Sequence, residues 1–175
     1  GISSPSEIEQ ALMLGLEVVK FFPAEASGGL AKIKAMAAPY TAMKFMPTGG
    51  INEKNLLAYL DFPKILACGG SWMVSDKLIN AGEFDKIREM TEAAVNMMLG
   101  FELAHIGINA SSETEAGGIA DAFCNVFGLE KKDGNSSIFA GSGVEVMKQP
   151  YLGAKGHIAI RTNYIERAIW YLEQR

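Results

Sequence analysis

The sequence has little of what disulfide-rich, zinc-finger and nucleic-acid-binding proteins depend on. It contains two cysteines, Cys68 and Cys124, which are too few and too far apart for a disulfide framework or a zinc site of spaced cysteines. No signal peptide is visible, and no apolar run is long enough to span a membrane. The net charge is −4 and there is no basic stripe or arginine cluster, which argues against nucleic acid as a partner. These absences predict a cytoplasmic protein without a nucleic-acid or membrane partner.

What is present is an ordinary globular composition with a β/α order in the first half. The 175 residues are 49% hydrophobic and 21% charged, enough for one good core or two small ones. Short apolar runs alternate with helical patterns, which predicts parallel strands covered by helices. We expect strands at about 17–22, 43–47 and 64–68, and helices at about 29–37, 52–60, 75–80 and 83–98.

Lys20 is the residue around which the first half is organised. It stands between two valines and two phenylalanines in the segment 18–22, which reads as a charge inside a buried strand. Burial lowers the pKa of an ammonium group and so produces a nucleophilic amine. The alternative interpretation is that Lys20 faces outward, with the aliphatic part of its side chain packed on a helix and its ammonium group in water.

Two later strands each end in a glycine pair, Gly49-Gly50 and Gly69-Gly70. Glycines after parallel strands leave backbone N–H groups exposed and allow a phosphate to come close. Lys44 also stands three residues before a proline in a strand, as Lys20 does. Periodicity alone therefore cannot choose between the two lysines.

These residues resemble the KDPG/KHG aldolases, class I enzymes that cleave 2-keto-3-deoxy-6-phosphogluconate and 4-hydroxy-2-oxoglutarate. The matching segments are 20–25 with 28–29, 47–51 and 69–72. The resemblance implies α/β architecture, with residues 1–99 forming strands six to eight of a (β/α)8 TIM barrel, and a class I lyase without a cofactor that acts in a trimer. It implies that Lys20 forms the Schiff base and that the substrate is bound by Phe22, Thr48, Gly49, Gly50, Gly70 and Ser71.

Three strands are less than half of such a barrel. The family places its glutamate general base and its carboxylate-binding residues on earlier strands, and those segments do not lie in this sequence. Glu25 lies near Lys20 but past the strand end, and is read either as a loop carboxylate or as a catalytic group. We therefore interpret the chain as an incomplete portion of an aldolase, without turnover by itself.

Residues 100–175 have a different character and contain an internal repeat. Ala104-His105-Ile106-Gly107-Ile108 returns as Gly156-His157-Ile158-Ala159-Ile160, and a helix is expected after each. The remaining elements expected are a helix at about 113–127 and strands at about 101–109, 137–140 and 144–148. The chain has no histidines other than His105 and His157. Glu145 stands on the strand before the second repeat, and two imidazoles with a carboxylate form a reasonable divalent-metal set.

This arrangement resembles the glyoxalase-like, or vicinal oxygen chelate, proteins, which are built from paired βαβββ modules. The resemblance implies an α+β module, incomplete at its C-terminus, with His105, Glu145 and His157 at three of the four metal-ligand positions. The alternative is a module that binds no metal. Two functional hypotheses follow: a class I aldolase that releases pyruvate with glyceraldehyde 3-phosphate or glyoxylate, or a glyoxalase-like module, with or without metal, attached to a degenerate barrel.

Overall fold

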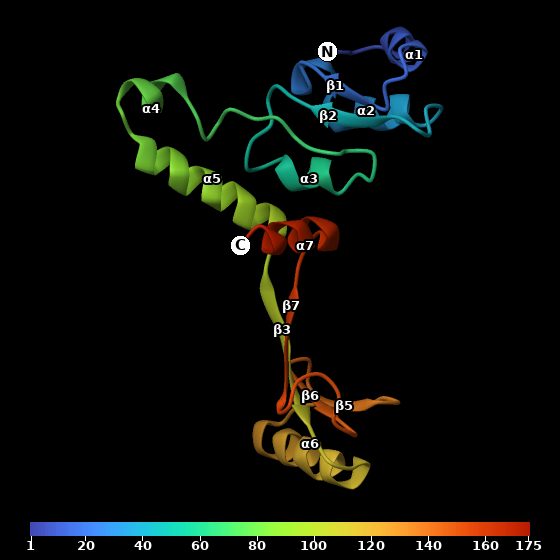
Figure 1. Ribbon diagram of the computed structural model, residues 1–175, viewed down its shortest axis with the longest axis vertical. Helices are drawn as coiled ribbons and strands as arrows, with labels where there is room; N and C mark the ends of the chain where they lie inside the picture. Colours follow the sequence, from blue (N-terminus) through green and yellow to red (C-terminus); the bar gives the residue numbers. More distant parts are fainter. The chain divides into compact units, whose positions relative to one another are not determined.

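The computed structural model describes all residues from Gly1 to Arg175, which divide into two compact units, Gly1–Met98 and Leu99–Arg175. Figure 1 shows the helices and strands of both units, coloured along the chain from blue at the N-terminus to red at the C-terminus. No helix in either unit is both long enough and apolar enough to cross a membrane. We call the two parts unit 1 and unit 2 and describe each by itself.

Unit 1 alternates helices with two short strands. In order along the chain it contains α1 (Pro5–Met13), β1 (Val18–Phe21), the 3-10 turn η1 (Glu25–Ser27), α2 (Gly29–Ala37), β2 (Lys44–Pro47), α3 (Leu56–Leu60), α4 (Asp76–Asn80) and α5 (Phe84–Leu99). The last residue of α5, Leu99, is the first residue of unit 2. The strands β1 and β2 are parallel, as the β/α order predicts. On the far edge of β1, Ile2 makes a parallel bridge to Phe21.

Side chains alternate across β1, and this alternation decides between the two interpretations of Lys20. Val19 and Phe21 are buried, whereas Val18 and Lys20 are exposed. Successive side chains of a strand point to opposite faces, so the two strand residues that flank Lys20 fill the core while Lys20 itself faces away from it. Of the two interpretations of this lysine, the exposed position is the one observed.

The third strand expected at 64–68 forms only as two isolated bridges, Phe45 to Ile65 and Thr48 to Gly69. Around the first bridge the ladder is normal, because Phe45 N–H donates to Lys64 O and Leu66 N–H donates to Phe45 O. Two residues further along β2 stands Pro47, which has no N–H to donate. The next ladder bond is made by Gly69 N–H to Pro47 O. The proline therefore interrupts a strand that apolar patterning alone predicts as continuous.

Unit 2 is a mixed sheet with two helices. Its elements are β3 (Glu102–Asn109), α6 (Glu113–Phe127), β4 (Lys131–Asp133), β5 (Ser137–Ala140), β6 (Val144–Met147), β7 (Gly156–Arg161) and α7 (Ile165–Glu173). The strand order is β4-β5-β6-β3-β7. The pair β3–β6 is parallel and the other neighbouring pairs are antiparallel. All three residues of β4 are exposed, and the sequence patterning did not predict this strand.

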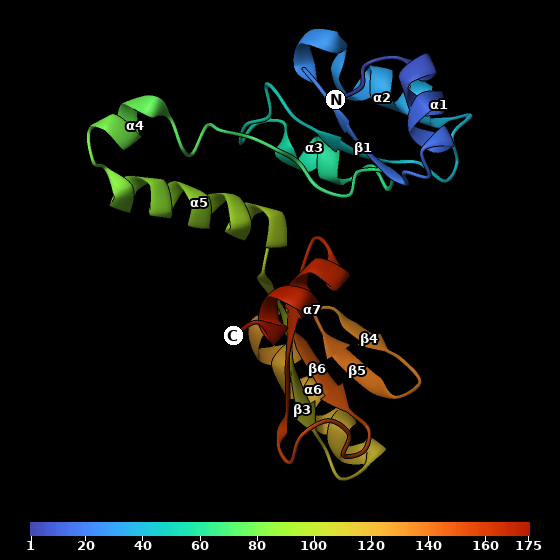
Figure 2. The same ribbon diagram turned by 45° about the horizontal axis from the view of Figure 1, so that its top comes forward.

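The core of unit 2 lies between α6 and one face of the sheet, as Figure 2 shows. It is formed by Ala110, Ala116, Ala120, Ile138 and Val146. Small alanines on α6 allow the helix to lie close to the strands. The opposite face of the same strands is left for the polar side chains described below.

Candidate functional site

The candidate site of unit 1 is a cavity of about 410 Å³ at the carboxyl ends of β1 and β2. Parallel strands bring their carboxyl ends to the same edge of a sheet, where ligands of α/β proteins bind. The cavity brings together every unit 1 residue that the sequence singled out for substrate. It is lined by Lys20, Phe22, Met46, Thr48, Gly49, Gly50, Ile51, Gly69, Gly70 and Ser71.

Position along the strands separates the two lysines that periodicity could not. Lys20 pairs with Met46 and Lys44 pairs with Val18, so both lysines share one face of the sheet. Only Lys20 lines the cavity, because it stands near the carboxyl end of its strand. Its Nζ lies 4.9 Å from the centre of the Phe22 ring, within cation–π distance.

The turn after β2 supplies backbone donors to this cavity. Gly49 and Gly50 have φ angles of +94° and +84°, a region that residues with a Cβ rarely adopt. The Gly50 carbonyl accepts bonds from the side-chain amides of Asn52 and Asn55, at 3.1 and 3.0 Å. Neither glycine N–H donates to another group of the chain. Free N–H groups on a turn held in this way suit an anion. The helix expected at 52–60 is shorter in the structure: a hydrogen-bonded turn, in which Leu56 N–H donates to Asn52 O, precedes α3, which begins at Leu56.

Close packing shapes the opposite wall of the cavity. A Cβ at Gly69 would lie 2.6 Å from Thr48 Oγ1, and a Cβ at Gly70 would lie 2.0 Å from the Trp72 ring. The absence of a Cβ at the two glycines therefore leaves the space that the Thr48 and Trp72 side chains occupy, and any larger residue would displace those side chains. Thr48 Oγ1 is buried and has no hydrogen-bond partner in the chain. Buried hydroxyl groups are normally paired, so this one is suited to a polar atom of a substrate.

Glu25 does not line the cavity. Its carboxylate accepts a hydrogen bond from the hydroxyl of Tyr59, a residue of α3 that is 2% exposed. Sequence reasoning missed Tyr59, because nothing in its neighbourhood along the chain signals a partner 34 positions away.

In unit 2, the structure brings together the three residues predicted as metal ligands. His105 Nε2 lies 3.1 Å from His157 Nε2 and 3.0 Å from Glu145 Oε2. His157 Nε2 lies 3.3 Å from the same Oε2. Sheet register explains the cluster, because β7 and β6 flank β3 on its two sides, with His157 and Glu145 both paired to Gly107. A Cβ at Gly107 would lie 2.1 Å from the His157 ring, so this glycine leaves the space that the ring fills.

The spacing of these three atoms fits a metal ion. Ligand atoms about 2.1 Å from a metal are about 3.0 Å apart at right angles and about 3.4 Å apart in a tetrahedron. Hydrogen bonds alone do not account for the triangle, because each Nε2 carries at most one hydrogen. No placement of these hydrogens turns all three contacts into hydrogen bonds.

A second layer of contacts holds the cluster. Ser137 Oγ donates to Glu145 Oε1 at 2.6 Å, which leaves Oε2 directed at the two histidines. The rings of His105 and Phe139 meet edge to face, with centroids 5.5 Å apart. Such contacts fix the orientation of ligand side chains in metal sites. Sequence reasoning did not predict a role for Ser137. The feature that could have revealed it is its position on β5, the strand that pairs with the strand of Glu145.

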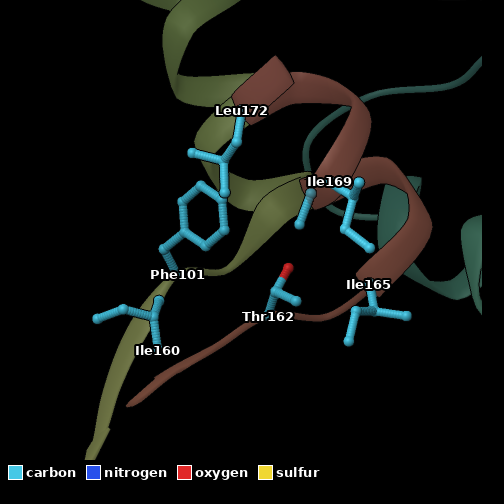
Figure 3. A pocket seen from close by; sticks show the side chains of 7 residues that line it. Phe101, Ile160, Thr162, Ile165, Ile169 and Leu172 are labelled. Atoms are coloured by element: carbon cyan, nitrogen blue, oxygen red, sulfur yellow. The ribbon is translucent and has the colours of Figure 1, made fainter. Parts of the chain in front are cut away.

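A further cavity in unit 2, of about 460 Å³, carries no such chemistry. It lies between α7 and the end of the sheet at which β3 starts and β7 ends. It is lined by Phe101, Ile160, Thr162, Ile165, Ala168, Ile169 and Leu172. Figure 3 shows that its labelled side chains are apolar except for Thr162. The Thr162 hydroxyl donates to Leu99 O at 2.6 Å. With no titratable group in the lining, this cavity belongs to neither candidate site.

Comparison with known proteins assigns the first half of the chain. The family model for KDPG and KHG aldolases matches residues 1–90. The chain belongs to the KDPG and KHG aldolase family. A 2-dehydro-3-deoxy-phosphogluconate aldolase of Treponema pallidum (strain Nichols) is 50% identical over 98 residues, which are 56% of this chain and 47% of the relative. The KHG/KDPG aldolase of Escherichia coli (strain K12) is 42% identical over 95 residues, 54% of this chain and 45% of the relative.

A solved structure in this family resembles the chain as well. The KDPG aldolase of Legionella pneumophila, crystallised with pyruvate captured as a covalent carbinolamine, is 41% identical with a TM-score of 0.52. The similarity covers 53% of this chain and 45% of that protein. The chain thus spans about half the length of the curated relatives that it matches. The family match ends at residue 90, so the glyoxalase-like module expected in residues 100–175 stays a prediction.

Proposed function

We propose that unit 1 is the C-terminal part of a class I aldolase barrel, in which Lys20 forms the imine with a 2-oxo acid. The observation that carries this proposal is the cavity, which is lined by Lys20, by the two glycine pairs and by Thr48, whose buried hydroxyl has no hydrogen-bond partner. The family membership supports it, because the relatives are named as aldolases of 2-dehydro-3-deoxy-phosphogluconate or of both family substrates. The proposed substrates are 2-keto-3-deoxy-6-phosphogluconate and 4-hydroxy-2-oxoglutarate.

The chemistry follows from an amine at this position. The Lys20 nitrogen attacks the C2 carbonyl, and loss of water gives a protonated imine. Removal of a proton from the C4 hydroxyl then breaks the C3–C4 bond, and the iminium nitrogen takes up the electron pair as an enamine. Glyceraldehyde 3-phosphate or glyoxylate leaves, and protonation and hydrolysis of the enamine release pyruvate and free Lys20. This cycle uses no metal ion and no cofactor.

The remaining parts of the proposal concern the proton acceptor, the groups that bind the substrate and the assembly of the barrel. The proton acceptor would come from barrel strands that precede this segment in the relatives, because the carboxylate of Glu25 is directed at Tyr59. Phe22 and Thr48 would contact the oxo acid. The N–H groups of Gly49, Gly50, Gly70 and Ser71 would bind its phosphate or distal carboxylate. We further propose that the intact barrel assembles as a trimer.

Borohydride trapping with pyruvate tests the proposal. We would use the chain itself and an extended version, in which the N-terminal part of the Treponema pallidum relative precedes residue 1. We expect a reduced pyruvyl adduct on Lys20 of the extended version. An adduct on Lys44, or none, would overturn the assignment. Lys44→Arg is the matched control, since it changes a lysine on the same sheet face outside the cavity.

We propose as a second function that unit 2 binds a divalent metal ion through His105, Glu145 and His157. The observation in its favour is the triangle of ligand atoms, 3.0, 3.1 and 3.3 Å on its sides. Three protein ligands leave positions for water or substrate, and a bound ion would act there as a Lewis acid. The module would then be glyoxalase-like, acting as a lyase, isomerase or oxygenase.

Calorimetric titration with Zn²⁺, Mn²⁺ and Ni²⁺ tests the second function. We expect one ion per chain, and loss of binding in His157→Ala. A titration without heat of binding, or with equal binding in the variant, would leave unit 2 as a metal-free module. Chelation should not change trapping at Lys20, so the two proposals can fail independently.

A further inference from the structure

The carboxylate of Glu25 connects two loops that border the unit 1 cavity. Glu25 opens η1, the turn that follows the Lys20 strand. Tyr59 lies on α3, the helix that follows the Gly49-Gly50 turn. The hydrogen bond from the Tyr59 hydroxyl to Glu25 Oε1 therefore joins the segments after β1 and after β2.

The glycine turn is enclosed by this connection. A Cβ at Gly50 would lie 2.6 Å from both Cβ and Cγ of Glu25, so the Glu25 stem rests directly on the Gly50 backbone. The backbone N–H of Glu25 donates to Gly49 O at 3.1 Å, and the neighbouring Ala24 N–H donates to Thr48 O at 2.8 Å. One face of the turn is thus fixed by Glu25, and its N–H groups remain free for a ligand.

Tyr59 gives the connection its rigidity. The tyrosine is 2% exposed, so its ring has one position. Burial, followed by the bond to the Glu25 carboxylate, raises the pKa of the Tyr59 hydroxyl far above its usual range. The hydroxyl therefore remains a donor at every pH at which an aldolase would act. Glu25 is itself an exposed residue, but the bond from a buried donor restrains its carboxylate and, with it, the rotamer of its side chain.

We propose that Glu25 and Tyr59 are positioning residues for the anion-binding turn at Gly49-Gly50. They hold the turn in the shape that binds the distal phosphate of the substrate, and they take no part in the imine chemistry of Lys20. This inference rests on the aldolase function proposed above. It assigns to Glu25 a role different from both alternatives that the sequence left open, the unattached loop carboxylate and the catalytic group.

Steady-state kinetics of Tyr59→Phe in the extended version tests the inference. Phenylalanine keeps the buried ring and removes only the hydroxyl. We expect KM for 2-keto-3-deoxy-6-phosphogluconate to rise about three- to tenfold, the size of effect that the loss of one ordinary hydrogen bond produces. We expect kcat to stay within about twofold, because the Lys20 chemistry is unchanged. Borohydride labelling of Lys20 with pyruvate, which has no phosphate, should equal that of the parent.

Two further variants separate positioning from other roles. Tyr40→Phe is the matched control, because the Tyr40 hydroxyl donates to Glu9 Oε1 at 3.0 Å on the exposed surface of the same unit, and it should change neither constant. Glu25→Gln keeps the stem and an oxygen that accepts from Tyr59, so it should retain nearly parental kinetics. Glu25→Ala loses the stem and the bond, and should raise KM at least as much as Tyr59→Phe.

Each contrary outcome has a distinct meaning. A parent that labels Lys20, together with an unchanged KM in Tyr59→Phe, overturns this inference and leaves the aldolase function standing. A large fall of kcat in Glu25→Gln also overturns it, because that result makes Glu25 a catalytic residue. If the parent extended version does not label Lys20, the aldolase function fails, and this inference fails with it.

Discussion

The candidate site of unit 1 is made largely of backbone, whereas that of unit 2 is made of three side chains. Around Lys20, the walls are glycine turns whose missing Cβ atoms leave room for neighbours and for an anion. Around Glu145, two histidine rings and a carboxylate converge on one point. A site of backbone is damaged by adding atoms, and a site of side chains by removing them. Substitutions of opposite kinds should therefore disable the two units.

Lys20 is the exception in unit 1, because it is the one position where removing a side chain should end the function. Lys20→Arg keeps the charge but replaces the amine with a guanidinium that stays protonated. In the extended version we expect aldol cleavage to fall on the order of 10³-fold or more. Cleavage assays with Lys44→Arg as control check this. Equal losses in the two variants would mean that the amine of Lys20 has no role in cleavage that the amine of Lys44 lacks.

Gly50→Ala tests the backbone character of the unit 1 site. The added Cβ would lie 2.6 Å from the Glu25 stem, at a φ of +84°. The backbone conformation alone costs about 1–2 kcal/mol, and the clash adds to it while displacing the turn. Gly15→Ala is the matched control, since Gly15 has a φ of +73° with no atom within 4 Å.

Denaturant unfolding and the KM for the phosphorylated substrate measure both effects. We expect Gly15→Ala to lose only stability and Gly50→Ala to lose stability and substrate affinity together. Parental affinity in Gly50→Ala would show that the turn does not bind the substrate.

Two substitutions test the side-chain character of the unit 2 site. Glu145→Gln removes the charged ligand and should abolish metal binding in calorimetry. Ser137→Ala removes only the bond to Glu145 Oε1 and should weaken binding by about 10- to 100-fold. Ser111→Ala is a control of the same chemistry, because Ser111 Oγ donates to Glu115 Oε2 away from the cluster. An unchanged affinity in Ser137→Ala would mean that Glu145 needs no orienting partner.

The comparison also shows which features a sequence reveals by itself. The glycine turns and Lys20 stand in short consecutive motifs, so they were visible before the fold. The ligand triangle was accessible only through the internal repeat, which places His105 and His157 at equivalent positions. Tyr59 and Ser137 belong to no motif. They act through partners that only the folded chain brings near, and sequence reasoning missed both.

Differences in the fold have equally local causes. The helix at 113–127 was predicted to the residue, because apolar periodicity and the closing Gly128 mark it. The strand β4 was missed because Lys131, Lys132 and Asp133 are all polar and exposed. Whether Lys20 is buried or faces outward could not be decided from the sequence, because the apolar run around it is nearly continuous. In the structure, one face of β1 is buried, with Val19 and Phe21, and the other is exposed, with Val18 and Lys20.

Borohydride trapping with pyruvate in the presence and absence of a chelator tests the central claim most directly. The claim is that the two units carry separate sites, a Schiff-base lysine in a backbone cavity and a metal-binding side-chain cluster. We predict that peptide mass analysis of the extended version finds the reduced adduct on Lys20, to the same extent with and without chelator. An adduct that depends on metal, or that lies on a residue other than Lys20, would contradict this account.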